Sequence, residues 1–402
     1  MEEPVSEFPG SDPGDPQQSP GQPAPAEPPQ PRAGSDAYGS EAGSDAPPSA
    51  VQPGAVGGAP PAGFTPGPEM VAGDGRYAGG GGAAAVGRSP RDAAMAVRAE
   101  VGKVVIGQEG VVSGLIAALL VGGHVLLEGV PGVAKTLSAK ALASSMDLAF
   151  QRVQFTPDLM PSDVIGQNIF QAGQGSFEFR EGPVFTNFLL ADEINRTPPK
   201  TQAALLEAME ERQVTIEGNA MPLPRPFIVI ATQNPIEYEG TYPLPEAQLD
   251  RFLFQLTVGY PTAEQELQIV GAHDSGLNAH DLASSGLRAV ASGADLLAGR
   301  AEIEAQRVDP RVQQYIVSLV RATRDVPSFS LGVSPRGATM LLKAAKAWAW
   351  LSGRGYVTPD EVKAIAKPAL RHRCQLRPEL ALEGATIDGV LDSVLAAVPV
   401  PR

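Results

Sequence analysis

The sequence predicts an α/β fold of the P-loop class, with a five-stranded parallel sheet followed by a smaller all-helical domain. Three observations support this prediction. The segment 124–128 is an apolar strand that runs into a glycine-rich loop and a helix. Further strands are expected at 150–155, 188–192, 227–232 and 252–256, most of them apolar at nearly every position, as in a parallel sheet buried on both faces. Beyond residue 261 the pattern becomes helical only.

Composition divides the 402 residues into three predicted regions. Residues 1–90 are rich in Pro, Gly and Ala, contain no Lys and hold more than half of the net charge of −14, so we expect a disordered acidic tail. The α/β core is expected at 91–260 and the helical domain at 261–402. The folded part is mildly acidic, which argues against nonspecific nucleic-acid binding through bulk charge.

The remaining compositional features predict a cytoplasmic protein. The N-terminus is acidic and lacks the features of a secretion signal. Cys374 is the single cysteine, and together with His372 it is expected to be structural because four scattered histidines make a poor metal-ligand set. The apolar segment 111–127 is interrupted by glycines, Ser113 and His124, so a helix followed by a buried strand explains it better than a membrane span.

Within this framework the pattern predicts seven helices and two hairpins. The helices are expected at 93–101, before Gly122, at 135–145, 262–273, 311–323, 334–350 and 359–370. The hairpins are expected at 163–180, with a turn at Gly173-Gln174-Gly175, and at 213–226, with a turn near Gly218. Additional helices are expected between the core strands.

The loop after the first strand has the spacing of a phosphate-binding loop. The residues expected to contact a nucleotide here are Gly129, Val130, Pro131, Gly132, Val133, Ala134, Lys135, Thr136 and Leu137. Backbone N–H groups would wrap the phosphates, Lys135 would reach the β and γ oxygens, and the Thr136 hydroxyl would coordinate Mg²⁺. Ala134 stands where the pattern has its last glycine, and we expect the loop to tolerate it if its φ is negative. An ordinary Gly-Pro turn is the alternative.

The strand at 188–192 ends in two adjacent carboxylates, Asp192 and Glu193. Because consecutive side chains of a strand point to opposite sides, we expect Asp192 to face the magnesium ion and Glu193 to polarise the attacking water. A solvated strand end is the alternative reading of such a pair. The preceding phosphate loop favours the catalytic one.

Three further polar residues are candidates for the same chemistry. Asn234 follows the next apolar strand and could hold the water or the γ-phosphate through its amide, although Asn-Pro is also a common turn. Arg251 opens the fifth strand and Arg336 opens a helix of the second domain. Either arginine could stabilise charge in the transition state, and a surface ion pair is the alternative for each.

In their order along the chain these motifs resemble the MoxR group of AAA+ ATPases. The resemblance is carried by Gly129–Thr136, Phe155–Asp163, Asp192–Arg196, Ala231–Pro235 and Leu249–Phe252, and it covers the chain from about Ala93 onward. It implies a P-loop AAA+ core with a helical lid, ATP and Mg²⁺ as ligands, and a homo-oligomeric ring, commonly a hexamer.

The resemblance also implies roles for individual residues. It assigns Asn234 as sensor 1, Arg251 as the arginine finger acting on a neighbouring subunit, with Arg196 as a second candidate, and Arg336 as sensor 2 reaching from the lid. The two hairpins correspond to the helix-2 insert and the pre-sensor-1 hairpin. The segment that borders the adenine consists of Val105, Ile106, Gly107 and Gln108.

Members of the group remodel or mature partner proteins, often with a partner that has a von Willebrand factor A domain, so an ATP-driven remodeller is the expected function. Two alternatives remain at this point. A nucleic-acid motor is disfavoured because the hairpin at 213–226 carries only Glu217 and Arg225 as charges and has no aromatic residue to stack on a base. An ATP-binding switch with little turnover is disfavoured by the presence of Lys135, Asp192 and Glu193.

Overall fold

The computed structural model describes residues 88–173, 175–234, 240–279 and 281–401. Almost all of the expected tail, Gln174 of the predicted glycine-rich turn, and Pro235 of the Asn-Pro dipeptide lie outside the described residues. The described part falls within one compact unit, Tyr77–Arg402. No helix in this part is both long and apolar enough to cross a membrane.

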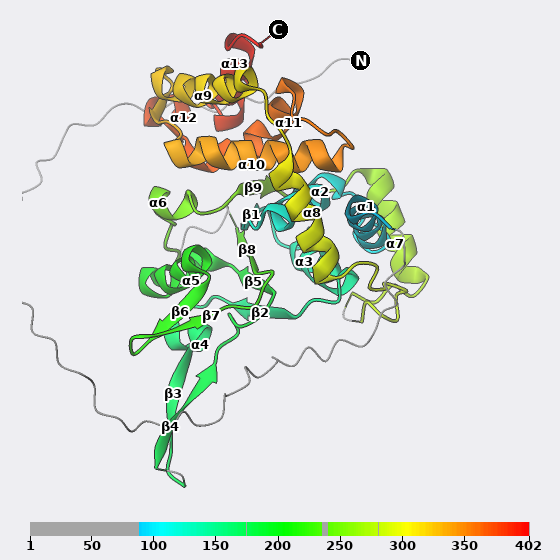
Figure 1. Ribbon diagram of the computed structural model, residues 1–402, viewed down its shortest axis with the longest axis vertical. Coiled ribbons are helices and arrows are strands. Elements are labelled where there is room, and N and C mark those ends of the chain that lie inside the picture. Colours follow the sequence, from blue (N-terminus) through cyan, green and yellow to red (C-terminus); the bar gives the residue numbers. More distant parts are fainter. Residues whose placement is uncertain (1–87, 174, 235–239, 280, 402) are drawn as a thin grey trace, which may run out of the picture. The chain divides into compact units, whose positions relative to one another are not determined.

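A five-stranded parallel sheet forms the centre of the described unit, as predicted (Figure 1). Its strands, in spatial order, are β2 (Phe150–Gln154), β5 (Phe188–Asp192), β8 (Ile228–Gln233), β1 (Val125–Glu128) and β9 (Phe254–Thr257). Residue pairs such as Leu126 with Ala231 and Gln154 with Asp192 set the register. The carboxyl ends of the strands therefore meet at one edge, where ligands of such folds bind.

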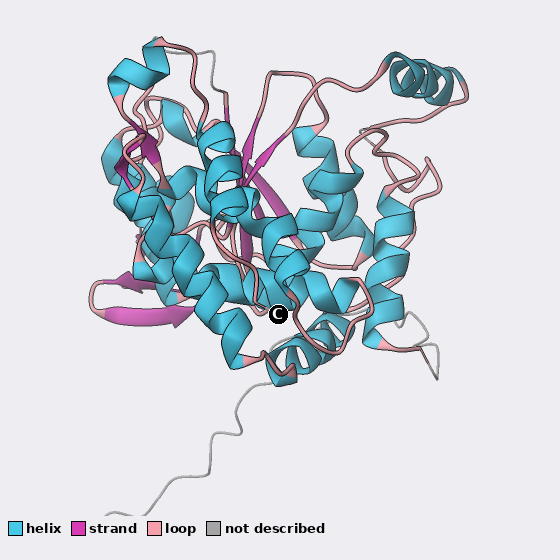
Figure 2. Cartoon of the chain, turned by 90° about the horizontal axis from the view of Figure 1, so that it is seen from above, coloured by secondary structure: helices cyan, strands magenta, loops and turns pink. Residues whose placement is uncertain are grey.

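Both faces of the sheet are buried. Along β1, Val125 and Leu127 belong to one apolar cluster, whereas Leu126 between them belongs to the other. The same alternation holds in β5 and β8, because successive side chains of a strand point to opposite faces. Figure 2 shows helices on both sides of the strands. This explains why the sequence of the central strands is almost continuously apolar.

The edge strand β2 departs from that expectation. Its residues are half-buried or exposed along its whole length, and Gln151, Arg152 and Gln154 are exposed. The prediction of a strand apolar at nearly every position was therefore wrong for β2. An edge strand has a neighbour on one side only, and this allows the long side chains of Arg152 and Gln154 to reach toward β5.

Helices pack on the sheet and precede the smaller helical region. Those of the core are α1 (Pro90–Val101), α2 (Glu109–Val121), α3 (Lys135–Ser145), α4 (Pro161–Ile165), α5 (Pro199–Glu211) and α6 (Glu246–Leu249), with a 3₁₀ turn η1 (Ile194–Arg196). Ser89 caps α1 by accepting a hydrogen bond from the Asp92 amide. The helix α2 ends at Gly122, whose φ of 64° is the left-handed conformation that favours glycine.

Both predicted hairpins are present. The first consists of β3 (Gly166–Gln171) and β4 (Ser176–Glu181), and the second of β6 (Gln213–Ile216) and β7 (Asn219–Pro222). In Figure 1 the β3–β4 hairpin projects from the end of the unit opposite to the C-terminal helices. It carries Phe170 and Phe177, which are both exposed and pack against each other with ring centroids 5.2 Å apart.

The C-terminal region contains the four helices that the sequence predicted and three that it did not. The predicted helices are α7 (Ala263–Asp274), α9 (Pro310–Asp325), α10 (Pro335–Leu351) and α11 (Pro359–Leu370), and the others are α8 (Gly293–Ala305), α12 (Pro378–Leu382) and α13 (Ile387–Ala397). The prediction that the region beyond residue 261 is entirely helical was wrong. The antiparallel strands β10 (Phe329–Leu331) and β11 (Gln375–Leu376) join α9 to the segment after the 3₁₀ turn η2 (Arg371–Arg373).

Candidate functional site

The loop after β1 borders a cavity of about 620 Å³. Its described lining consists of Val104, Ile106, Gln108, Gly132, Val133, Ala134, Lys135, Thr136, Leu137, Lys140, Phe150, Arg152, Pro261, Ile269, His273, Leu277 and Ala279. Lys135, Lys140 and Arg152 bring positive charge to the wall. The cavity thus has the size of a small-molecule site and a cationic part suited to phosphates.

The loop itself has the shape that a phosphate cradle needs. A Cβ added to Gly129 would lie 2.4 Å from the carbonyl oxygen of Val258, the residue after β9. Only glycine therefore allows the loop to leave β1 this close to its neighbouring strand β9. Gly132 has a φ of 83°, again in the left-handed region. Lys135 Nζ donates a hydrogen bond to the Gly129 carbonyl oxygen at 2.6 Å, across the loop. Val130 and Pro131 connect these positions.

The condition of a negative φ at Ala134 is not met. Ala134 has φ 64° and ψ 23°, a left-handed conformation, at the residue just before α3. A residue with a Cβ is disfavoured there by about 1 kcal/mol or more. The motif places a glycine at this position because glycine takes up the left-handed conformation without strain. In this protein alanine adopts the same conformation at a cost.

Part of the cavity wall is apolar. Val104, Ile106, Pro261 and Leu277 are among its lining residues. Of the segment predicted to border adenine, Ile106 and Gln108 line the cavity, Gly107 takes a φ of 78°, and Val105 is buried in the core. Such a wall offers a flat purine base apolar contacts.

Gln108 fixes the position of this segment. Its Nε2 donates to the Gly259 carbonyl oxygen at 3.0 Å, which ties the segment to the chain just after β9. Gln108 is 7% exposed, so this hydrogen bond is largely shielded from water.

Asp192 lies at the carboxyl end of β5 and is held by two neighbouring strands. Arg152 of β2 donates to Asp192 Oδ2 from Nε at 3.0 Å and from a terminal nitrogen at 2.7 Å. Thr232 of β8 donates through its hydroxyl to Asp192 Oδ1 at 2.5 Å. The carboxylate is 8% exposed, so these contacts fix its orientation beside the cavity wall formed by Arg152.

Glu193 does not continue the strand. The prediction derived its direction from strand alternation, but Glu193 has φ 56° and ψ 50°, so the chain turns at this residue. The turn is stabilised by the Thr232 hydroxyl, which accepts a hydrogen bond from the Glu193 amide at 2.8 Å. Glu193 Oε2 accepts hydrogen bonds from Gln154 Nε2 at 2.8 Å and from Arg196 at 2.9 Å. Asp192 and Glu193 thus bind different partners, and strand alternation does not set the direction of Glu193.

Asn234 follows β8 and is 5% exposed. The Gln233 carbonyl oxygen beside it accepts a hydrogen bond from the Gly129 amide at 3.4 Å. Asn234 therefore lies at the same sheet edge as Gly129, Asp192 and Glu193.

Arg251 and Arg336 lie together, and neither is among the described residues that line the cavity. Arg251 Nε is 3.1 Å from Glu210 Oε2, and a terminal nitrogen of Arg336 is 3.1 Å from Glu210 Oε1. Glu210 is near the end of α5, Arg251 follows α6, and Arg336 is in the first turn of α10. One carboxylate therefore holds both arginines at the junction of the core and the C-terminal helices.

The residues present fit a nucleotide with Mg²⁺. Among the described residues no group of three or more His, Cys, Asp or Glu could hold a metal. Mg²⁺ at nucleotide sites is bound by one or two protein oxygens, with phosphates and water as the other ligands. Thr136 on the cavity wall and Asp192 behind Arg152 would be such protein ligands.

The prediction from sequence missed three residues of this site, Arg152, Gln154 and Thr232. Each contacts one or both of the two acids. Polar residues at positions 152 and 154 of an otherwise strand-like segment were the available signal. These polar side chains come from the strands next to β5. Their contact with the acid pair can be recognised only when the order of the strands in the sheet is known.

Comparison with known proteins agrees with this geometry. Residues 124–254 match the family model described as ATPase family associated with various cellular activities (AAA), and residues 321–393 match the AAA lid domain. The chain is 49% identical over 301 residues to the uncharacterized protein YeaC of Bacillus subtilis, covering 75% of this chain and 92% of the relative. It is 44% identical over 313 residues to Chaperone MoxR1 of Mycobacterium tuberculosis, covering 75% and 81%.

The fold also matches a solved structure, that of a candidate ATPase from Cytophaga hutchinsonii. The TM-score is 0.71 at 43% sequence identity, and the match covers 78% of this chain and 96% of the other. The sheet order, the loop-and-acid site and these relatives agree, and the chain belongs to the MoxR family of AAA+ ATPases.

Proposed function

We propose that this protein binds and hydrolyses ATP with Mg²⁺ and uses the energy to remodel or mature partner proteins. The observation that carries the proposal is the arrangement at the carboxyl edge of the sheet. There a cationic cavity bordered by the loop 129–136 lies beside Asp192, which touches the cavity-lining Arg152. This combination supplies both of the elements that phosphoryl transfer to water requires, phosphate binding and acid groups at strand ends.

Individual residues have distinct roles in this proposal. The amides of the loop and Lys135 bind the phosphates, and Thr136 and Asp192 hold Mg²⁺, which when bound neutralises phosphate charge. Glu193 polarises the attacking water. Gln154 and Arg196 contact its carboxylate and orient it. Asn234 supplies an amide at the same edge.

Each site is completed by a neighbouring subunit. Arg251 and Arg336 share Glu210 and lie outside the described lining of the cavity of their own chain, which favours action on the nucleotide of an adjacent subunit. The resemblance implies this role for Arg251 alone, and the shared carboxylate extends it to Arg336. Arg196 is the weaker candidate for this role because it already pairs with Glu193 of its own chain at 2.9 Å. The proposed assembly is a ring, with six subunits as the expected number.

The proposed clients are proteins in the cytoplasm, with a von Willebrand factor A domain protein as a candidate partner. The relative named Chaperone MoxR1 supports this role. The nucleic-acid motor remains the second candidate function, and strong stimulation of ATP hydrolysis by DNA that is lost at high salt would favour it instead.

The central test replaces Glu193 with Gln in the assembled protein. Loss of the carboxylate should lower the ATP hydrolysis rate by about 10²-fold or more while ATP binding is retained. The matched control is Glu207→Gln, which alters an exposed acid on α5. An unchanged rate in Glu193→Gln would refute the assignment of Glu193. Negligible single-turnover hydrolysis by the unaltered assembly would favour the ATP-binding switch.

The same variant is suited to finding the client. Held in ATP, Glu193→Gln should retain its partner in a pull-down. The control is Lys135→Ala held under the same conditions, because a subunit that cannot bind ATP should not reach the retaining state.

A further inference from the structure

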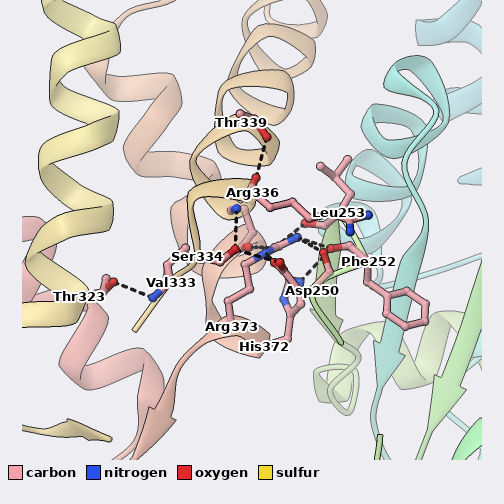
Figure 3. A network of polar contacts seen from close by, with 12 residues as sticks. Asp250, Phe252, Leu253, Thr323, Val333, Ser334, Arg336, Thr339, His372 and Arg373 are labelled. Atoms are coloured by element: carbon pink, nitrogen blue, oxygen red, sulfur yellow. Dashed lines mark hydrogen bonds and ion pairs between the residues drawn. The ribbon is translucent and has the colours of Figure 1, made fainter. Parts of the chain in front are cut away.

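A buried polar network joins the segment that carries Arg251 to the helix that carries Arg336 (Figure 3). At its centre is Arg373 of η2, which is 4% exposed. Its Nε donates to Asp250 Oδ1 at 2.6 Å, and Asp250 is the residue directly before Arg251. A buried guanidinium paired in this way is a fixed point of the structure.

The remaining donors of Arg373 bind backbone carbonyl oxygens, most of them in the segment that carries Arg251. They reach the carbonyl oxygens of Asp250 at 3.2 Å, Phe252, and Leu253 at 3.4 Å, and that of Ala369 in α11. His372 Nε2 adds a hydrogen bond to the Phe252 carbonyl oxygen at 3.0 Å. These hydrogen bonds thus attach the backbone on both sides of Arg251 to the C-terminal region.

Ser334 connects these contacts to the helix that carries Arg336. Its hydroxyl donates to Asp250 Oδ2 at 2.9 Å and accepts from the Gly337 amide at 3.2 Å, so it also caps α10. Arg336 lies in the first turn of this helix, two residues after Ser334. The Asp250 carboxylate therefore accepts from Arg373 through one oxygen and from Ser334 through the other.

The packing leaves room for this arrangement only at a glycine. A Cβ added to Gly337 would lie 2.9 Å from Arg373 Cδ and 2.3 Å from Val333 Cγ1. The first turn of α10 therefore rests directly on Arg373.

We propose that Asp250, Ser334 and Arg373 are positioning residues that present Arg251 and Arg336 as one rigid unit to the neighbouring subunit. A movement of the lid would then move both arginines together, so the two charges would reach the neighbour's phosphates in one step. This inference rests on the proposed function, since it requires that the arginines act between subunits.

The test uses Arg373→Lys and Ser334→Gly. Lysine keeps the charge but loses the fork of donors, and glycine is tolerated at a helix N-cap but has no hydroxyl for Asp250. Each variant should lower the maximal ATPase rate of the assembly, by up to about 10²-fold for Arg373→Lys, because small misplacements of catalytic groups are costly. Affinity for a fluorescent ATP analogue should be unchanged. Thr386→Gly, at the N-cap of α13, is the control and should keep full activity.

Mixing subunits separates positioning from a general structural defect. Lys135→Ala subunits lack a working nucleotide site but keep their arginines. Co-assembled with Arg373→Lys subunits, they should restore part of the activity, because each Arg373→Lys site that borders a Lys135→Ala subunit would receive correctly positioned arginines from it. Ser334→Gly should behave in the same way, and it decides the matter if Arg373→Lys does not assemble.

The same experiment contains its own reference, Arg251→Ala mixed with Lys135→Ala. If that mixture recovers activity and the Arg373→Lys and Ser334→Gly mixtures do not, the positioning role is refuted and the proposed function stands. If ATP-analogue affinity falls in parallel with the rate, the network serves its own site and the inference is also refuted. If the Arg251→Ala mixture fails to recover despite verified co-assembly, the proposed action between subunits is itself wrong.

Discussion

Arg152 and Asp192 form an ion pair in which two nitrogens of one guanidinium contact one carboxylate oxygen, at 3.0 and 2.7 Å. Arg152 comes from the edge strand β2 and lines the cavity, whereas Asp192 ends the neighbouring strand β5. The carboxylate assigned to Mg²⁺ is thus also the partner of a cation from its own chain. Two cations near one carboxylate compete for it.

This relationship predicts that Arg152→Gln lowers the Mg²⁺ concentration needed for nucleotide binding. The Arg152 side chain is half exposed, so water screens the pair and the expected change is about threefold. The measurement is a Mg²⁺ titration of fluorescent ATP analogue binding, with Arg180→Gln on the exposed β4 strand as the control. A higher Mg²⁺ requirement in Arg152→Gln would mean that the arginine assists the metal site rather than competing with it.

The left-handed conformation of Ala134 leads to a second prediction. Ala134→Gly should raise the free energy of unfolding by about 0.5–1 kcal/mol, because glycine relieves the strain but also gains freedom in the unfolded chain. Thermal or denaturant unfolding measures the change. The control Ala139→Gly, at a buried position inside α3, should destabilise the protein. Destabilisation by both substitutions would show that Ala134 is not strained.

Two glycines in the first turns of helices should respond in opposite ways to the same substitution. Gly337→Ala should destabilise the protein by about 1–3 kcal/mol, because the added Cβ would overlap Val333 and crowd Arg373. Gly110→Ala in α2 should be neutral or stabilising by up to about 1 kcal/mol, because a Cβ there would meet no described atom within 4 Å beyond the adjacent residues and backbone of its own helix. Denaturant unfolding of both variants gives the comparison. Equal effects would contradict the close packing of α10 on Arg373.

The sequence predicted the sheet, both hairpins and most helices because these depend on local signals. The helix α3 begins at Lys135, directly after the glycine-rich loop, and α11 begins at Pro359, both as predicted. The helix α8 was missed although Ser292 and Asp295 form a capping box at its start. Its buried residues Leu296, Gly299 and Ile303 have helical spacing, but the middle one is a glycine, which weakens the apolar stripe.

The candidate site was predictable only in part. The phosphate loop and the acid pair are each continuous in sequence, so each could be proposed from its own local pattern. The pairing of Arg251 and Arg336 with Glu210 joins three distant segments and depends on how α10 packs on the core. The turn at Glu193 is stabilised by Thr232 of another strand, a contact that no local pattern shows.

A last prediction concerns the stability of the core at acidic pH. His124 is buried at the start of β1, where Nε2 donates to the Met209 carbonyl oxygen at 3.1 Å and Nδ1 accepts from the Val229 amide at 2.9 Å. A protonated ring could not accept that hydrogen bond. Burial, the main cause, lowers the pKa of His124 from 6.5 to about 4. His372, also buried, has its pKa lowered well below 6.5, again mainly by burial.

In the unfolded chain these histidines take up protons below about pH 6.5, while in the folded protein they stay neutral to much lower pH. The stability they contribute is therefore complete above pH 6.5 and is lost as the pH falls toward 4, by about 3 kcal/mol for His124. Denaturant unfolding at about pH 7.5 and about pH 5 should show about two thirds of this loss. His124→Asn, which keeps a donor and an acceptor, should be less stable at neutral pH but lose less on acidification. An equal loss in the variant would show that other groups govern the acid response.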